Sequence, residues 1–181
     1  MDRETILENH TVIVRNGVIA EVGPAEQTEI PAGATRINGN GRYLMPGLAE
    51  MHGHVPGPDD PDYLHNILFL YISNGVTTVR NMAGNSYHPE LREEIRNGEV
   101  RGPNLYTASP WLSDDNVPSP EDAEHIVDKY QEAGFDLLKL GSVSPETYDR
   151  LAARANEIGM PFGEHIADRN PEFTSDVALP D

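Results

Sequence analysis

Between residues 48 and 166 the sequence alternates short apolar segments with longer amphipathic segments, and glycine and proline separate them. The spacing in DYLHNILFLYISNG, with apolar residues at 63, 64, 67, 68 and 71, is typical of an amphipathic helix. Strands separated by single helices imply right-handed crossovers and a parallel sheet. The pattern therefore predicts an α/β fold with five parallel strands, at 48–54, 76–80, 105–109, 136–140 and 161–166.

The predicted helices carry recognisable start and stop signals. Ser119 and Ser144 each precede a proline, which is the arrangement of a capping residue followed by the first helical position. Gly75, Gly134 and Gly159 follow the last periodic residues of three helices, where glycine commonly ends a helix. We expect the helices to begin and end at these residues.

The first 47 residues follow a different pattern. The segment TVIVRNGVIAEVG, residues 11–23, places two β-branched runs around Asn16-Gly17, the dipeptide that favours a type I′ hairpin turn. Further turn residues and one short strand follow. We therefore expect a small all-β unit at 1–47, too small to close a sandwich alone, and an α/β unit at 48–181.

Composition excludes several classes of protein. The formal net charge of −17 disfavours a nucleic-acid partner, because most of the surface would repel a polyanion. Cysteine is absent, so disulfides, thiolate ligands and a cysteine nucleophile are excluded. The longest apolar run, ILFLYI at 67–72, is too short to span a bilayer, so we expect a soluble, cytoplasmic protein with no membrane partner.

Candidate chemistry gathers at the ends of the predicted strands. His52 and His54 close the first strand, and residues two apart in a strand share a face at about 7 Å. Arg80, Lys139 and His165 end the second, fourth and fifth strands. Parallel α/β folds place their sites at this edge of the sheet, so we expect these side chains to converge there.

Plainer interpretations of the same residues stay open. Lys139 could form a salt bridge with a carboxylate at the edge, and His165 could be a hydrogen-bonded core histidine. His65, His88 and His125 lie within or beside helices whose exposed faces can carry them, so they need no function. No G-x-S-x-G elbow, P-loop or G-x-G-x-x-G cradle occurs, so serine catalysis and nucleotide binding have no motif behind them.

Four segments together resemble a known family. GRYLMPGLAEMHGHV, NGVTTVRNMAG, AGFDLLKL and GMPFGEHI resemble the metal-dependent amidohydrolase superfamily, in particular its imidazolonepropionase-like and prolidase-like branch. The resemblance runs from about residue 10 to residue 167. It implies a partial (β/α)₈ TIM-type barrel of about five βα units at 48–181, preceded by part of a small β-sandwich at 1–47.

The resemblance also implies a metal site. His52 and His54 would bind the more buried of one or two divalent ions, Lys139 would carry a carbamate derived from carbon dioxide and bridge the two ions, and His165 would bind the second. Zinc suits imidazole and oxygen ligands without cysteine. Arg80 is a candidate substrate-binding residue.

The implied activity is hydrolysis of an amide, cyclic amide or dipeptide C–N bond in a small molecule, through metal-bound hydroxide. The family also uses a sixth-strand histidine and an eighth-strand aspartate, the usual base, and no residue after His165 matches either motif. We therefore expect a chain that is incomplete at both ends, with its catalytic base unassigned. A non-catalytic remnant or assembly partner and an isomerase or lyase-like member of the same scaffold remain alternatives. Open sheet edges favour a homo-oligomer.

Overall fold

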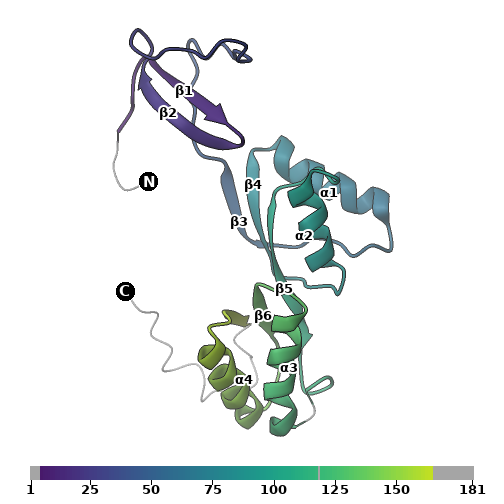
Figure 1. The fold of residues 1–181 in the computed structure, drawn as a ribbon. Helices are drawn as coiled ribbons and strands as arrows, with labels where there is room; N and C mark the ends of the chain where they lie inside the picture. Colours follow the sequence, from purple (N-terminus) through teal and green to yellow (C-terminus); the bar gives the residue numbers. More distant parts are fainter. Residues whose placement is uncertain (1–4, 118, 165–181) are drawn as a thin grey trace. The chain divides into compact units, whose positions relative to one another are not determined.

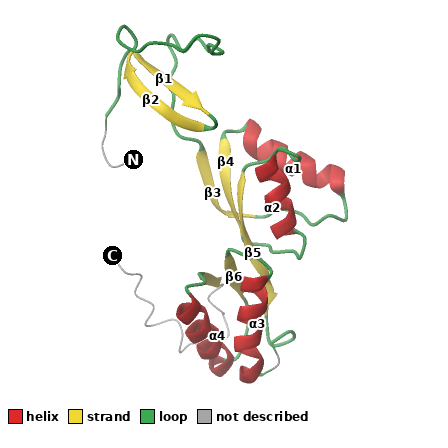
Figure 2. Cartoon of the chain, viewed as in Figure 1, coloured by secondary structure: helices red, strands yellow, loops and turns green. Residues whose placement is uncertain are grey.

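The computed structural model describes residues 5–117 and 119–164, and it divides the chain into two compact units between Met45 and Pro46. Figure 1 shows the elements in chain order, and Figure 2 shows that strands alone form the regular structure of the first unit. Each unit is described by itself.

The first unit contains the predicted hairpin. β1 (His10–Arg15) pairs antiparallel with β2 (Val18–Pro24). The connecting residues Asn16 and Gly17 both have positive φ, 52° and 76°, as a type I′ turn requires. The hairpin prediction is confirmed. Whether this unit is part of a β-sandwich stays a prediction.

The second unit is an α/β domain built on one parallel sheet of five strands in the order β3-β4-β5-β6-β7. Every strand is hydrogen-bonded to the strand that follows it in the chain, the arrangement that begins a (β/α)₈ barrel. The fold class predicted from the sequence is confirmed. The strands are β3 (Leu48–Gly53), β4 (Val76–Asn81), β5 (Asn104–Leu112), β6 (Leu137–Leu140) and β7 (Phe162–Glu164), and the helices are α1 (Pro61–Ser73), α2 (His88–Asn97), α3 (Pro120–Glu132) and α4 (Pro145–Ile158).

Two apolar clusters attach the helices to the sheet. Val79 of β4 and Leu105 of β5 pack with buried leucines of α1 and α2. Leu138 and Leu140 of β6 pack with buried residues of α3 and α4. Because Leu138 and Leu140 face the helices, Lys139 between them faces the opposite side of the sheet, the interior of a barrel.

The helix ends follow the sequence signals with one exception. The Ser144 hydroxyl caps α4 by accepting a hydrogen bond from the backbone N–H of Thr147 at 3.2 Å. Ser119 occupies the expected capping position of α3, but its hydroxyl donates to the Asp122 carboxylate at 2.8 Å instead. A carboxylate in the first turn is a better acceptor for the hydroxyl and also complements the helix dipole.

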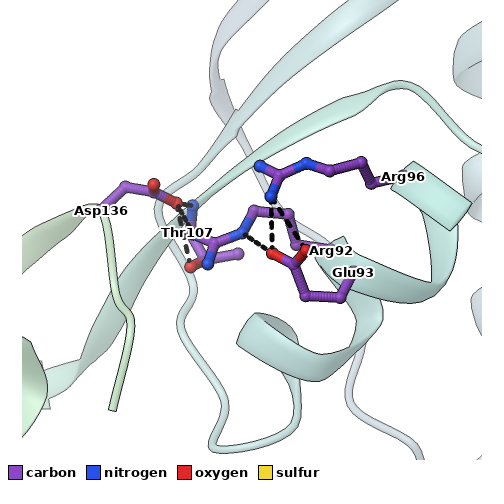
Figure 3. A network of polar contacts seen from close by, with 5 residues as sticks. All are labelled: Arg92, Glu93, Arg96, Thr107 and Asp136. Atoms are coloured by element: carbon purple, nitrogen blue, oxygen red, sulfur yellow. Dashed lines mark hydrogen bonds and ion pairs between the residues drawn. The ribbon is translucent and has the colours of Figure 1, made fainter. Parts of the chain in front are cut away.

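A polar network joins α2, β5 and the residue before β6 (Figure 3). The Asp136 carboxylate accepts hydrogen bonds from Arg92 Nη1 at 2.6 Å and from the backbone N–H of Thr107 at 2.7 Å. Burial lowers the pKa of Arg92, but the hydrogen bonds and charges of Asp136 and Glu93 outweigh it, so the pKa is raised overall. Arg92 therefore stays charged. Its bond to Asp136 holds the chain where β6 begins, and Lys139 lies near the other end of the same strand.

None of the helices in residues 5–117 and 119–164 is long and apolar enough to cross a membrane.

Candidate metal-binding site

The residue between the two histidines fixes the direction in which they point. Gly53 is buried, and a Cβ built on it would lie 2.6 Å from Val79 Cγ1 and 3.0 Å from the Tyr71 hydroxyl of α1. The Cβ direction at Gly53 is thus the helix-covered face of the sheet. His52 and His54 flank Gly53 and are both exposed, so their side chains point to the uncovered face although the pairing of β3 with β4 shifts register between Glu50 and Gly53.

The two imidazoles lie together on that face. Their ring centroids are 5.6 Å apart, with the ring planes tilted by 40°, and both side chains are exposed. The backbone N–H of His52 donates to Glu50 Oε1 at 2.8 Å. Two imidazoles at this separation can share one divalent ion without a change in the backbone.

Hydrogen bonds hold the backbone on either side of His54. The Gly53 carbonyl accepts from the backbone N–H of Met82 at 2.8 Å. The backbone N–H of Val55 donates to Asn81 Oδ1 at 2.9 Å, and the Pro56 carbonyl lies 3.0 Å from His88 Nε2. The chain that follows β3 is therefore hydrogen-bonded to the end of β4 and to the first residue of α2.

Lys139 is placed by an irregularity in the neighbouring strand. The pairing of β5 with β6 shifts register between Ala108 and Trp111, and the Ser109 hydroxyl accepts the backbone N–H of Lys139 at 2.9 Å. The side chain is only 2% exposed. Its Nζ atom lies 5.7 Å from the centroid of the Trp111 ring, within the range of a cation–π contact.

The Nζ atom of Lys139 is a buried amine without a hydrogen-bond partner in the part of the chain that the structure describes. Burial, and secondarily the charge of Arg80, lowers the pKa of this amine. An isolated buried ammonium is costly, so the surroundings favour the neutral amine. The salt bridge that the sequence left open as an alternative for Lys139 is absent among the described residues.

Arg80 lies on β4 and is half-buried. Its Nε atom donates to the Met51 carbonyl of β3 at 2.7 Å, which ties the guanidinium to the strand that carries the histidines. This bond orients the Arg80 side chain.

The structure brings two of the expected residues together, His52 and His54, whose ring centroids lie 5.6 Å apart. The positive charge of Arg80 contributes to the lowered pKa of Lys139. Within residues 5–117 and 119–164 no group of three or more histidine, cysteine or acidic side chains is arranged to hold a metal. His165 lies outside the described residues. All four described residues lie on parallel strands toward their carboxyl ends, or directly after one, but a shared metal site stays a prediction.

His88 differs from the expectation. The sequence suggested an exposed helix position without a role, and the structure places the side chain at 0% exposure, bonded to both strand-end loops. That expectation was wrong because the tight turn at 82–87 brings the first residue of α2 beneath the loop that follows β3. His65 and His125, on the outer faces of α1 and α3, are exposed as expected.

Comparison with characterised proteins gives partial matches. The chain is 29% identical to an ochratoxinase of Aspergillus niger over 126 residues, which cover 59% of this chain and 25% of the relative. It is 32% identical to an enamidase of Eubacterium barkeri over 89 residues, which cover 48% of this chain and 23% of the relative. This chain thus spans about a quarter of the length of these relatives. No family model matches.

Comparison with solved structures covers more of the chain. A protein from Bifidobacterium longum that has been proposed to be a prolidase superposes with a TM-score of 0.76 at 28% sequence identity. The match covers 89% of this chain and 45% of the other protein. Both units of this chain therefore have counterparts in a larger protein of the same fold.

Proposed function

We propose, on the premise that this chain belongs to the amidohydrolase superfamily, that it forms the metal-binding part of a hydrolase acting on amide C–N bonds. The observation that carries the proposal is the pair His52 and His54, whose rings lie 5.6 Å apart on the uncovered face of a parallel sheet. Two imidazoles at a strand end are a suitable start for a divalent metal site.

The residues present fit such an ion. His52 and His54 offer neutral nitrogen donors on one face, and Lys139 offers a buried amine without a hydrogen-bond partner among the described residues. A lysine without a chemical role would lose the hydration of its ammonium here without gaining a hydrogen bond from the described residues. The burial of Lys139 therefore supports a chemical role for its nitrogen.

We propose that Lys139 carries a carbamate. The neutral amine would attack carbon dioxide, form an N–C bond and release one proton, and the product is an anion with two oxygen ligands. The side chain would change from an unfavourable buried cation to an anion that two divalent ions could neutralise. The lowered pKa of Lys139 agrees with this step, because only the unprotonated amine reacts.

The division of roles follows from these positions. A divalent ion held here would act as a Lewis acid toward the scissile carbonyl and would activate water. His52 and His54 would hold the ion, and Met51, through its carbonyl, would keep Arg80 oriented toward an anionic group of the substrate. The base that takes a proton from water has no assignment among the described residues.

The substrate class comes from the relatives. An enamidase acts on an amide by its name, and a prolidase is the function proposed for the similar solved structure. We propose an amide, cyclic amide or dipeptide as the substrate. Because this chain spans only part of each relative, the activity is proposed for the whole protein in which this domain occurs.

The proposal is tested by metal binding. Zinc titration of the 181-residue chain by calorimetry should show a zinc affinity that falls by more than about tenfold in His52→Ala and in His54→Ala. Loss of a residue that only orients a metal ligand already lowers metal affinity by about tenfold or more, so loss of a ligand should cost at least as much. His65→Ala is the matched control, because His65 is an exposed histidine of the same unit. Equal zinc affinity in all four proteins would contradict the proposed site.

The carbamate is tested separately. After equilibration with ¹³C-bicarbonate, we expect a carbamate carbon signal in the zinc-loaded chain that disappears in Lys139→Met and persists in Lys129→Met, where the lysine is exposed. A spectrum without that signal in the zinc-loaded chain would remove Lys139 from the proposal and leave the histidine pair in place.

A further inference from the structure

A fully buried polar pair lies next to the histidine loop, by which we mean residues 54–60 between β3 and α1. Asn81, the last residue of β4, and His88, the first residue of α2, are both 0% exposed. Asn81 Nδ2 lies 2.8 Å from His88 Nδ1. We define this pair as the Asn81–His88 clasp.

The partners of the clasp determine the protonation of the imidazole. His88 Nδ1 accepts a hydrogen bond from the backbone N–H of Asn85 at 3.0 Å and another from Asn81 Nδ2. Both partners are donors, so Nδ1 is unprotonated and the proton lies on Nε2, which donates to the Pro56 carbonyl at 3.0 Å. The Asn81 amide is oriented equally clearly, because Oδ1 accepts the backbone N–H groups of Val55 and Ala83.

The clasp is hydrogen-bonded to the two residues that follow His54, the proposed metal ligand. It binds the N–H of Val55 and the carbonyl of Pro56, which are the first and second residues after His54. On the other side of His54, the Gly53 carbonyl is bonded to Met82. The backbone of the histidine loop is therefore held on both sides, and His54 is left with its ring on the uncovered face.

The clasp also has a firm support of its own. A Cβ built on Gly84, in the loop that carries Asn85, would lie 2.1 Å from the Ser109 carbonyl oxygen and 2.2 Å from that of Ala108. This loop therefore lies directly on β5. A chain of contacts therefore runs from β5 to the turn at 82–87, from that turn to His88, and from His88 to the loop that follows His54.

We propose that the Asn81–His88 clasp is a positioning device that fixes the backbone after His54, so that His52 and His54 are preorganised for one divalent ion. His88 touches neither the ion nor the substrate and acts through Pro56. The inference rests on the proposed function, since it assigns to the clasp the geometry of that same site. Burial lowers the pKa of His88, which keeps the ring neutral and the bonding pattern unchanged.

Two conservative variants separate the two ends of the clasp. In His88→Gln the amide nitrogen can occupy the place of Nε2 and donate to Pro56. In His88→Asn the amide oxygen can occupy the place of Nδ1 and accept from Asn85 and Asn81, but nothing reaches Pro56. His125→Asn is the matched control, because His125 is exposed on α3.

The first measurement is the affinity for Co²⁺, with the visible spectrum of the bound ion as a signature of its ligand geometry. We expect His88→Asn to bind Co²⁺ roughly tenfold more weakly, with an altered spectrum, as for residues that orient ligands. His88→Gln and His125→Asn should stay within about threefold of the wild type. Unchanged affinity and spectrum in folded His88→Asn would overturn the inference.

The second measurement needs no metal. Amide hydrogen exchange of the metal-free chain should be at least roughly tenfold faster in residues 53–55 of His88→Asn, with α3 and β6 unchanged. Unchanged exchange in residues 53–55 would overturn the inference whatever the metal results. Failure of the wild-type chain to bind any divalent ion would instead contradict the proposed function, and the exchange result would still decide whether the clasp holds the loop.

The third measurement covers the case in which His88→Asn does not fold. Long-range ¹H–¹⁵N spectra of the wild-type chain should show His88 protonated at Nε2 and bare at Nδ1. A ring protonated at Nδ1, or at both nitrogens near neutral pH, would overturn the inference without any variant.

Discussion

Two buried polar side chains of the α/β domain are treated in opposite ways. His88, where β4 leads into α2, is 0% exposed and has a hydrogen-bond partner for each ring nitrogen. Lys139, on β6, is 2% exposed, and its Nζ atom has no hydrogen-bond partner among the described residues. The first is a completed hydrogen-bond network, and the second is a buried amine to which we assign a chemical role only as a proposal.

The comparison separates support from chemistry. A buried polar group whose partners are all present holds backbone in place, as His88 does for the loop after His54. A buried amine without a hydrogen-bond partner among the described residues is unfavourable, and for Lys139 we propose that a carbamate removes the unfavourable state. Opposite effects on stability should follow when each is replaced by an apolar side chain of similar size.

The largest effect is expected at the completed network. His88→Leu removes the partner of Asn81 Nδ2, of the Asn85 N–H and of the Pro56 carbonyl, and leaving buried groups unpaired costs about 1–3 kcal/mol each. We expect the free energy of unfolding to fall by about 3 kcal/mol, measured by urea denaturation. His125→Leu should change it by less than about 0.5 kcal/mol. Equal free energies of unfolding for His88→Leu and His125→Leu would show that the hydrogen bonds of His88 do not stabilise the fold.

The next effect concerns the glycine between the two histidines. Gly53→Ala places a methyl group about 2.6 Å from Val79 Cγ1, and the branched, buried valine has little freedom to withdraw. Overpacking of this kind costs about 1–3 kcal/mol. A urea melt should show this loss together with weaker zinc binding, because the strand that presents the histidines must shift.

Gly39→Ala is the control for that substitution. A Cβ at Gly39 meets nothing within 4 Å, so its stability should match that of the wild type. Wild-type stability in Gly53→Ala would show that the face of the histidines is not fixed by the packing of Gly53.

A smaller effect of opposite sign is expected at Lys139. In buffer free of metal and bicarbonate, Lys139→Met replaces a buried amine that has no hydrogen-bond partner among the described residues with an apolar side chain of similar length. We expect the free energy of unfolding to rise by about 1–2 kcal/mol, because burying a polar group without a hydrogen bond costs about 1–3 kcal/mol and methionine does not incur that cost. Lys129→Met, at an exposed position, should be neutral in the same urea melts. A lower free energy of unfolding in Lys139→Met would show that the Lys139 amine makes stabilising interactions in the folded chain.

The smallest expected effect is a dependence of stability on pH. The pKa of His88 is lowered from 6.5 by burial, so below pH 6.5 the unfolded chain takes up a proton that the folded ring resists. The unfolded state then binds more protons, and stability is fully present above pH 6.5 and falls as the pH drops toward the lowered folded pKa. Urea melts of the metal-free chain from pH 7.5 to pH 5 should show this loss in the wild type and less of it in His88→Gln. The same loss of stability with falling pH in the wild type and in His88→Gln would show that the folded chain accepts a proton on His88 as readily as the unfolded chain does.

Much of the architecture could be predicted from the sequence because it is local. Periodicity gave the five strands and four helices, and Asn16-Gly17 gave the hairpin turn. The direction of His52 and His54 also follows from the two-residue period of a strand. These features depend on neighbours in the chain, which the sequence displays directly.

The features that the sequence did not reveal depend on contacts between distant segments. The burial of His88 arises from contact with Pro56, 32 residues earlier, and the Ser109 contact that places Lys139 spans 30 residues. A histidine at the start of a helix carries no local mark of such contacts. One signal was available: Asn81 ends a buried strand, where an amide needs several partners and predicts a polar network nearby.

The most direct test of the account is the position of zinc in crystals of the chain grown with zinc and bicarbonate. Anomalous diffraction should place a zinc ion about 2.0–2.1 Å from a ring nitrogen of His52 and a ring nitrogen of His54. Electron density at Lys139 Nζ should extend to a carbamate facing the same ion. A zinc ion bound elsewhere, with the rings of His52 and His54 empty at saturating zinc, would contradict the central claim that this strand end is a metal site.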